Sequence, residues 1–83
     1  MITNNKKDFK MLHDSAIKST TKRKGCPYFW CVFTESGLIK SRFSKTERKS
    51  LNTAFIEISH HTKCICVMSY KCDIYSIIKN EEI

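Results

Sequence analysis

Cysteines and histidines are the residues of this chain that could hold a metal ion, and the stretch HHTKCIC brings four of them together. His60 precedes Cys64 with three residues between them, and His61 precedes it with two, which are spacings close to those of zinc ligands. A structural zinc site needs a second ligand pair, and the sequence offers none at a matching spacing. The set that a small zinc-binding domain would use is Cys26, His60, His61, Cys64 and Cys66. We expect buried, reduced thiols instead, with no metal and no cofactor, because apolar strand patterns surround most of the cysteines.

The same residue types could supply a cysteine nucleophile and a histidine base. No spacing brings a cysteine to a histidine in the way that this chemistry requires, and the chain has no catalytic signature. We therefore predict that the protein is not an enzyme and has no catalytic residues. The three histidines are expected at the surface or at helix ends.

Aromatic and basic side chains are concentrated in the stretch YFWCVFTESGLIKSRF, residues 28–43. In a hairpin that turns at Gly37, one face carries Tyr28, Trp30, Lys40 and Arg42. Aromatic rings beside cations can bind single-stranded nucleic acid, because the rings stack on bases and the cations contact phosphates. Alternatively, the N-terminal helix covers this face and the two cations reach past it to water. Both interpretations remain open from the sequence.

Positive charge is the other feature with functional content. The net charge is +7, and residues 1–50 hold twelve basic and four acidic side chains. A field concentrated in this way attracts polyanions and acidic protein surfaces. Together with Tyr28 and Trp30, the predicted binding residues are Lys22, Arg23, Lys24, Lys40, Arg42, Lys45, Arg48 and Lys49.

Helices and a hairpin must position these residues. The spacing of Phe9, Leu12 and Ala16 predicts a helix over residues 3–18, capped by Thr3. A basic linker follows up to residue 25. A three-residue loop at 35–37 then predicts a hairpin in which Trp30 pairs with Arg42 and Phe33 pairs with Ile39.

A second helix follows the hairpin. Ser44 and Glu47 predict its start as a capping box, and its apolar stripe consists of Leu51, Ala54, Phe55 and Ile58. We expect this stripe to cover the hairpin face that carries Phe29, Phe33, Ile39 and Phe43. Phe55 should then contact Phe29 or Phe33.

The segment KCICVMSYKCDIYSII predicts one long strand or two short ones, with a turn within residues 70–73. The chain therefore reads as one α+β domain, residues 1–83, in the order α-β-β-α-β(-β), with an antiparallel sheet and a helix packed on one face. Its parts are a helix and basic linker (1–25), a hairpin-helix-strand core (26–79) and a tail (80–83).

The N-terminus has no apolar segment of signal-peptide length and no run is long enough to span a bilayer, so we expect a cytoplasmic protein without a membrane partner. A short, Lys-, Asn- and Ile-rich chain without a catalytic set resembles, in composition alone, the small accessory proteins of phages and other mobile elements. That resemblance implies an inhibitor of the anti-defence, anti-CRISPR or host-takeover type, which binds a host protein or nucleoprotein complex through an acidic surface of the partner. The alternative is a module that binds DNA or RNA directly.

Overall fold

Two helices and four strands make up residues 6–81, the part of the chain that the computed structural model describes. In chain order they are α1 (Lys6–Ser19), β1 (Tyr28–Thr34), β2 (Gly37–Ser44), α2 (Glu47–Ile58), β3 (Lys63–Tyr70) and β4 (Asp73–Glu81). The strands form one antiparallel sheet in the order β2-β1-β3-β4. The predicted α+β fold is confirmed, and its last segment forms two strands. The predicted cap, Thr3, lies outside the described residues.

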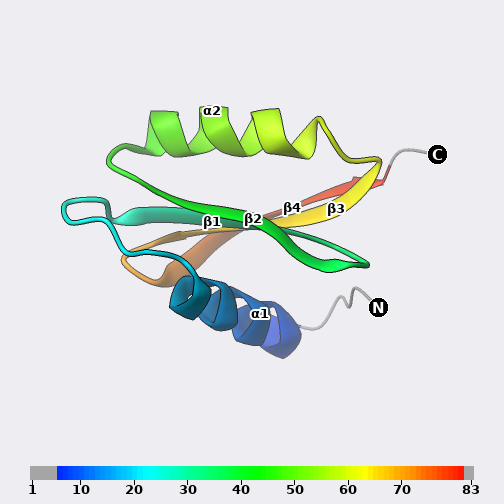
Figure 1. Ribbon diagram of the computed structural model, residues 1–83, viewed down its shortest axis with the longest axis horizontal. Coiled ribbons are helices and arrows are strands. Elements are labelled where there is room, and N and C mark those ends of the chain that lie inside the picture. Colours follow the sequence, from blue (N-terminus) through cyan, green and yellow to red (C-terminus); the bar gives the residue numbers. More distant parts are fainter. Residues whose placement is uncertain (1–5, 82–83) are drawn as a thin grey trace.

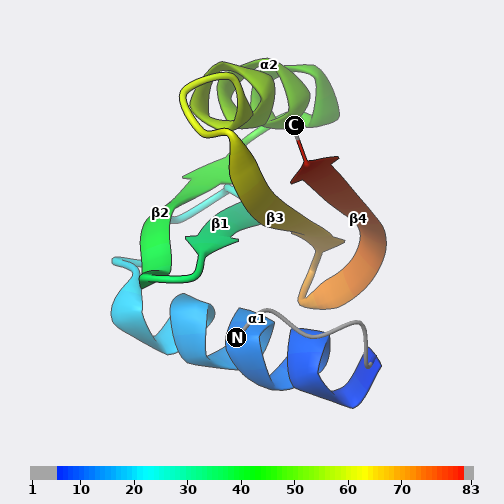
Figure 2. The same ribbon diagram turned by 90° about the vertical axis from the view of Figure 1, so that its right-hand side faces the viewer.

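The two helices lie on opposite faces of the sheet (Figures 1 and 2). The central strands β1 and β3 are therefore buried on both sides, which explains the long apolar runs in their sequences. One apolar cluster lies under α1 and consists of Phe9, Ala16, Phe29, Cys31, Phe33, Phe43, Ile65 and Val67. The other lies under α2 and consists of Trp30, Val32, Ala54, Ile58, Cys64, Cys66 and Met68.

The β1–β2 hairpin has the predicted register except next to its turn. Trp30 pairs with Arg42 as predicted, but Phe33 pairs with Leu38 and not with Ile39. The loop contains two residues, 35 and 36, and a bulge beside Phe33 accommodates the residue that a three-residue loop would have held. Ile39 consequently leaves the core face and is 42% exposed.

α2 covers the opposite face of the hairpin from the one we predicted. It packs on Trp30 and Val32 through Ala54 and Ile58, whereas α1 covers the face that carries Phe29. Phe55, which we expected against Phe29 or Phe33, is 52% exposed.

The path of the chain from β2 to β3 explains this placement. Both strands pair antiparallel with β1, so they run parallel to each other, and α2 crosses over β1 to connect them. Crossovers between parallel strands of one sheet are right-handed in nearly all proteins, and the path seen in Figures 1 and 2 has this hand. The hand of the crossover therefore selects the face for α2 when both faces are apolar.

α2 also begins two residues later than predicted. Thr46 is its N-cap, and the Thr46 hydroxyl accepts a hydrogen bond from the Lys49 backbone N–H at 3.2 Å. Ser44 is the last residue of β2, where it pairs with Tyr28. The predicted capping box of Ser44 and Glu47 is therefore wrong.

α1 has the predicted apolar stripe, but a polar side chain lies within it. Phe9 and Ala16 are buried and Leu12 is half-buried. His13, expected at the surface or at a helix end, lies in the middle of α1 and is 0% exposed. Within residues 6–81, neither helix has the length and hydrophobicity that crossing a membrane would require.

The β3–β4 hairpin turns at Lys71 and Cys72, inside the predicted turn region. Both residues have positive φ angles, 48° and 70°. β4 continues to Glu81, so the predicted tail is wrong for residues 80 and 81, while 82 and 83 lie outside the described residues. The Asn80 side-chain amide donates to the backbone carbonyl of His61 at 2.9 Å, which holds this end of β4.

Candidate functional site

Trp30 lies in the core and not on a binding face. It is 1% exposed beneath α2, and its indole N–H donates to the Thr53 hydroxyl at 2.9 Å. Of the two interpretations of the hairpin face, the covered one is therefore correct, although α2 and not the N-terminal helix provides the cover. A ring in this position has no face on which a base could stack.

Tyr28 is half-buried, and its nearest aromatic neighbour comes from β3. The ring centroids of Tyr28 and Tyr70 are 4.8 Å apart, Tyr70 is 40% exposed, and the Lys71 ammonium lies 5.3 Å from the Tyr70 centroid. Sequence reasoning missed Tyr70 and Lys71 because their neighbours on β1 are distant in the chain. Only a prediction that β1 pairs with β3 could have placed Tyr70 and Lys71 next to Tyr28.

Most of the predicted basic residues meet at one end of the molecule, where β1 and α2 begin and β2 ends (Figure 1). The β3–β4 turn lies at the same end, since the Lys71 backbone N–H donates to the Pro27 carbonyl at 2.8 Å. We call this end the basic pole, and it consists of Lys22, Arg23, Lys24, Arg42, Lys45, Arg48, Lys49 and Lys71. The acidic residues in the same segments are Glu47 and Asp73.

A small cavity of about 170 Å³ opens within the basic pole. We call it the Ser44 pocket, and its lining consists of Arg23, Cys26, Arg42, Phe43, Ser44, Lys45 and Lys49. The four cations come from three parts of the chain: the loop before β1, the end of β2 and the start of α2. Within residues 6–81, none of the four forms an ion pair with a carboxylate.

Lys40 does not belong to this cluster. It lies further along β2, and its ammonium is 3.8 Å from the carboxylate of Glu57, near the end of α2. Of the predicted binding residues, the structure therefore brings together the linker and the start of α2 with Arg42, and it separates Lys40 and Trp30 from them.

A larger groove of about 430 Å³ lies between α1 and β4. Phe9, Ile74 and Ile77 provide much of its lining, and Lys10 is the charged residue in it. Tyr75 and Ser76 add hydroxyl groups to its lining, and Lys10 is already ion-paired with Asp14 at 3.0 Å, so the lining has no unpaired charge to orient an ionic ligand.

The candidate zinc ligands are distributed over the two ends of the molecule. Cys26 lines the Ser44 pocket, whereas His61 lies after α2 and its imidazole Nε2 is 2.7 Å from the Glu57 carboxylate. Cys64 and Cys66 are buried under α2, and His60 is exposed. In the part of the chain that the structure describes, no three side chains gather as metal ligands.

The buried cysteines have the properties of core residues. Burial raises the pKa of Cys31, and burial together with the neighbouring Cys64 raises the pKa of Cys66 to about 12. Burial and then the Glu57 carboxylate raise the pKa of Cys64. The thiolate is the nucleophilic form, so these three thiols are poorly suited to catalysis at neutral pH.

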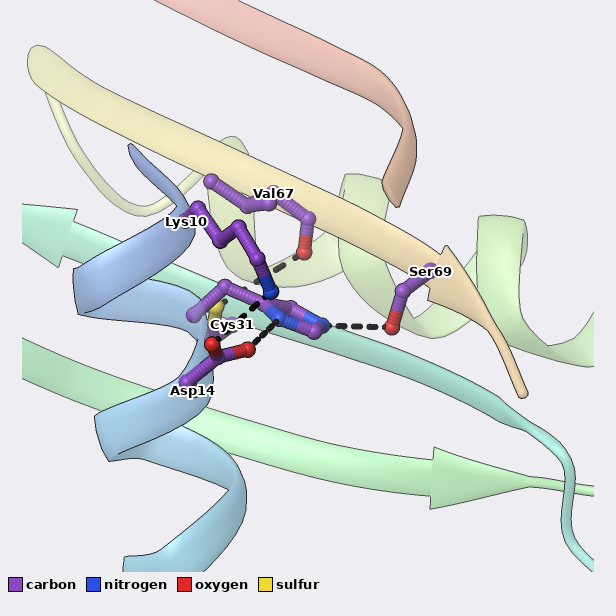
Figure 3. Close-up of polar contacts among 6 residues, drawn as sticks. Lys10, Asp14, Cys31, Val67 and Ser69 are labelled. Atoms are coloured by element: carbon purple, nitrogen blue, oxygen red, sulfur yellow. Dashed lines mark hydrogen bonds and ion pairs between the residues drawn. The ribbon is translucent and has the colours of Figure 1, made fainter. Parts of the chain in front are cut away.

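A hydroxyl, an imidazole and a carboxylate form a chain of contacts beneath α1 (Figure 3). The Ser69 hydroxyl lies 2.6 Å from His13 Nε2, and the Asp14 carboxylate lies 3.0 Å from His13 Nδ1. Hydrogen bonds from Lys10 and then from His13 hold the pKa of Asp14 below its ordinary value. Hydrolases use the same three groups, but Ser69 and His13 are both 0% exposed. A substrate could reach the hydroxyl only if α1 left the sheet, so the contacts described here anchor the helix.

Comparisons with protein-family models, with curated protein sequences and with solved structures each found no match for this chain.

Proposed function

We propose that this protein is a small non-catalytic binding protein of the cytoplasm, which docks its basic pole on an acidic surface of a protein or nucleoprotein partner. The role of inhibitor, of the anti-defence or host-takeover type, follows from its compositional resemblance to accessory proteins of phages and mobile elements. One strand and one helix contribute to the pole as well as loops: Arg42 lies on β2, and Arg48 and Lys49 lie on α2.

The observation that carries the proposal is the convergence of unpaired cations from separate segments. Arg23, Arg42, Lys45 and Lys49 line one pocket, and within residues 6–81 they have no carboxylate partner. Like charges held close together repel one another, and this repulsion destabilises the folded protein. An acidic partner would neutralise these charges and remove the repulsion. Arginine is also enriched at the energetic centres of protein interfaces.

Direct binding of nucleic acid is a second candidate, and the Tyr28–Tyr70 pair favours it. Tyr70 offers a partly exposed ring next to Lys71 at the basic pole, and a ring beside a cation suits a base and its phosphate. The burial of Trp30 argues for the protein or nucleoprotein partner, since it removes the largest stacking ring from the surface.

A capture experiment with matched variants tests the proposal. Arg23→Gln with Lys45→Gln removes two charges from the basic pole, and Lys40→Gln with Lys63→Gln removes two charges elsewhere on the surface. We expect the wild-type protein and the second variant to retain one defined complex from an extract of the cells in which the protein is made. The pole variant should lose it. Retention that resists nuclease identifies a protein contact, and equal retention by the pole variant would contradict the proposal.

A further inference from the structure

Ser44 is an unusual residue to find in the lining of a positively charged pocket, because its hydroxyl is buried without a partner. The residue is 3% exposed, and within the described part of the chain its Oγ makes no hydrogen bond. An unsatisfied buried polar group costs about 1–3 kcal/mol. A ligand that accepts a hydrogen bond from this hydroxyl would remove that cost.

The backbone places this hydroxyl among the cations. Arg42 and Ser44 are two residues apart on β2, so their side chains lie on the same face of the sheet, the one that α2 covers. Lys45 precedes α2 and Lys49 lies in its first turn, whose backbone N–H groups add partial positive charge. The Cys26 backbone N–H donates to the Arg23 carbonyl at 3.2 Å, which closes the loop that carries Arg23.

We propose that the Ser44 pocket binds a phosphate group through the Ser44 hydroxyl and the side chains of Arg23, Arg42, Lys45 and Lys49. The inference rests on the proposed function and deepens it, because it assigns a chemical group to the partner's acidic surface. A phosphate monoester carries a charge of about −1.5 to −2 at neutral pH and three acceptor oxygens. Two guanidinium groups provide paired donors that match those oxygens. A carboxylate carries one negative charge and two oxygens, so it would satisfy fewer of these donors.

The nearest carboxylate in the sequence does not compete for the pocket. Glu47 is exposed on the first turn of α2 and is not among the lining residues. Thr46 has its own partner, the Lys49 backbone N–H. Within residues 6–81, no group of the protein is therefore bonded to the Ser44 hydroxyl or ion-paired with the four cations.

NMR titration of the full chain with inorganic phosphate, at constant ionic strength set with chloride, tests the proposal. We expect saturable shifts at the amides of Arg42, Ser44 and Lys45. Ser44→Ala should weaken phosphate binding about tenfold, as the loss of one hydrogen bond to a charged group predicts. Arg42→Gln should weaken it by more, and Lys63→Gln, which removes an exposed cation at the start of β3 and outside the basic pole, should change it less than about twofold.

Titrations with other ligands identify the source of the phosphate group and test whether the pocket is a phosphate site at all. If dimethyl phosphate binds as tightly as inorganic phosphate, the natural ligand is a phosphodiester of a nucleic-acid backbone. If dimethyl phosphate binds much more weakly, the natural ligand is a phosphate monoester. Both results support a phosphate site. Acetate that binds as tightly as phosphate, or unchanged affinity in Ser44→Ala, would overturn it. Ser44→Ala should keep or gain thermal stability, because it removes an unpaired hydroxyl, so misfolding would not confuse the result. If phosphate fails to bind while the pole variant still loses its captured complex, the proposed function stands and this inference alone is wrong.

Discussion

At the scale of single residues, buried polar atoms with a partner and those without one have opposite consequences. The Trp30 indole N–H has the Thr53 hydroxyl as its acceptor, and the Thr53 hydroxyl itself contacts the carbonyls of Lys49 and Ser50. The hydroxyls of Ser44 and Ser50 have no partner in the described part of the chain. The hydrogen bond between Trp30 and Thr53 stabilises the contact between β1 and α2. Each of the two serine hydroxyls, in contrast, is a donor without an acceptor.

Replacement of Thr53 by Val tests the role of Trp30 in the core. Val keeps the shape of the side chain but leaves the buried indole N–H unpaired, so we expect unfolding free energy to fall by about 1–3 kcal/mol. Thr53→Ser keeps the hydroxyl and should lose less. Urea unfolding can be followed by the fluorescence of Trp30, which is the single tryptophan. Equal stability of the Val and Ser variants would show that this hydrogen bond contributes nothing.

At the scale of elements, the β3–β4 turn stores strain. Two-residue hairpin loops whose central residues both have positive φ favour Asn and Gly, yet this loop contains Lys71 and Cys72 at φ of 48° and 70°. A side chain in the left-handed region costs about 1–2 kcal/mol. The turn persists because the flanking strands are paired and because the Lys71 N–H is bound to the Pro27 carbonyl.

We expect Cys72→Gly to raise the free energy of unfolding by about 1 kcal/mol, because relief of the left-handed strain exceeds the entropy that glycine adds to the unfolded chain. Cys72→Ala is the matched control, since it removes the same exposed thiol but retains Cβ. It should give no gain. Chemical denaturation of both variants measures the difference, and an Ala variant as stable as the Gly variant would refute the strain argument.

The sequence predicts the elements better than it predicts their arrangement, and the reasons are physical. Periodicity located both helices and the hairpin, because apolar spacing reflects local geometry. It could not assign a helix to a face, since β1 is apolar on both sides and carries Phe29 on one and Trp30 on the other. The candidate site was found in part: the basic residues of the pole other than Lys71 were predicted. The roles of Ser44 and Tyr70 depend on where β2 ends and on the β1–β3 pairing.

At the scale of the whole molecule, positive charge is concentrated at one end of the long axis (Figure 1). The basic pole gathers cations from both halves of the chain, including Lys71 from the nearly neutral second half. Acidic and basic residues are mixed towards the other end, where α2 and β4 finish: Lys40 is ion-paired with Glu57, and Lys63 lies opposite Glu81 on the adjacent strands. A molecule with this asymmetry should approach a negatively charged partner with its pole leading, and the effect should weaken as salt rises.

The affinity for bare oligonucleotides decides between the two partner classes. We expect random single-stranded and double-stranded oligonucleotides to bind no tighter than the non-specific range, about 10⁻⁶ to 10⁻⁴ M at physiological salt. The slope of log affinity against log salt should flatten by about 0.7 per lost phosphate contact on single strands. Arg23→Gln with Lys45→Gln should therefore flatten it, whereas Lys40→Gln with Lys63→Gln should leave it nearly unchanged, because those two cations lie outside the pole. Equal flattening in both variants would contradict the concentration of charge at the pole. Nanomolar binding of oligonucleotides that persists at moderate salt would contradict the protein or nucleoprotein partner. It would show that the protein binds nucleic acid directly, through the basic pole and the Tyr70 ring.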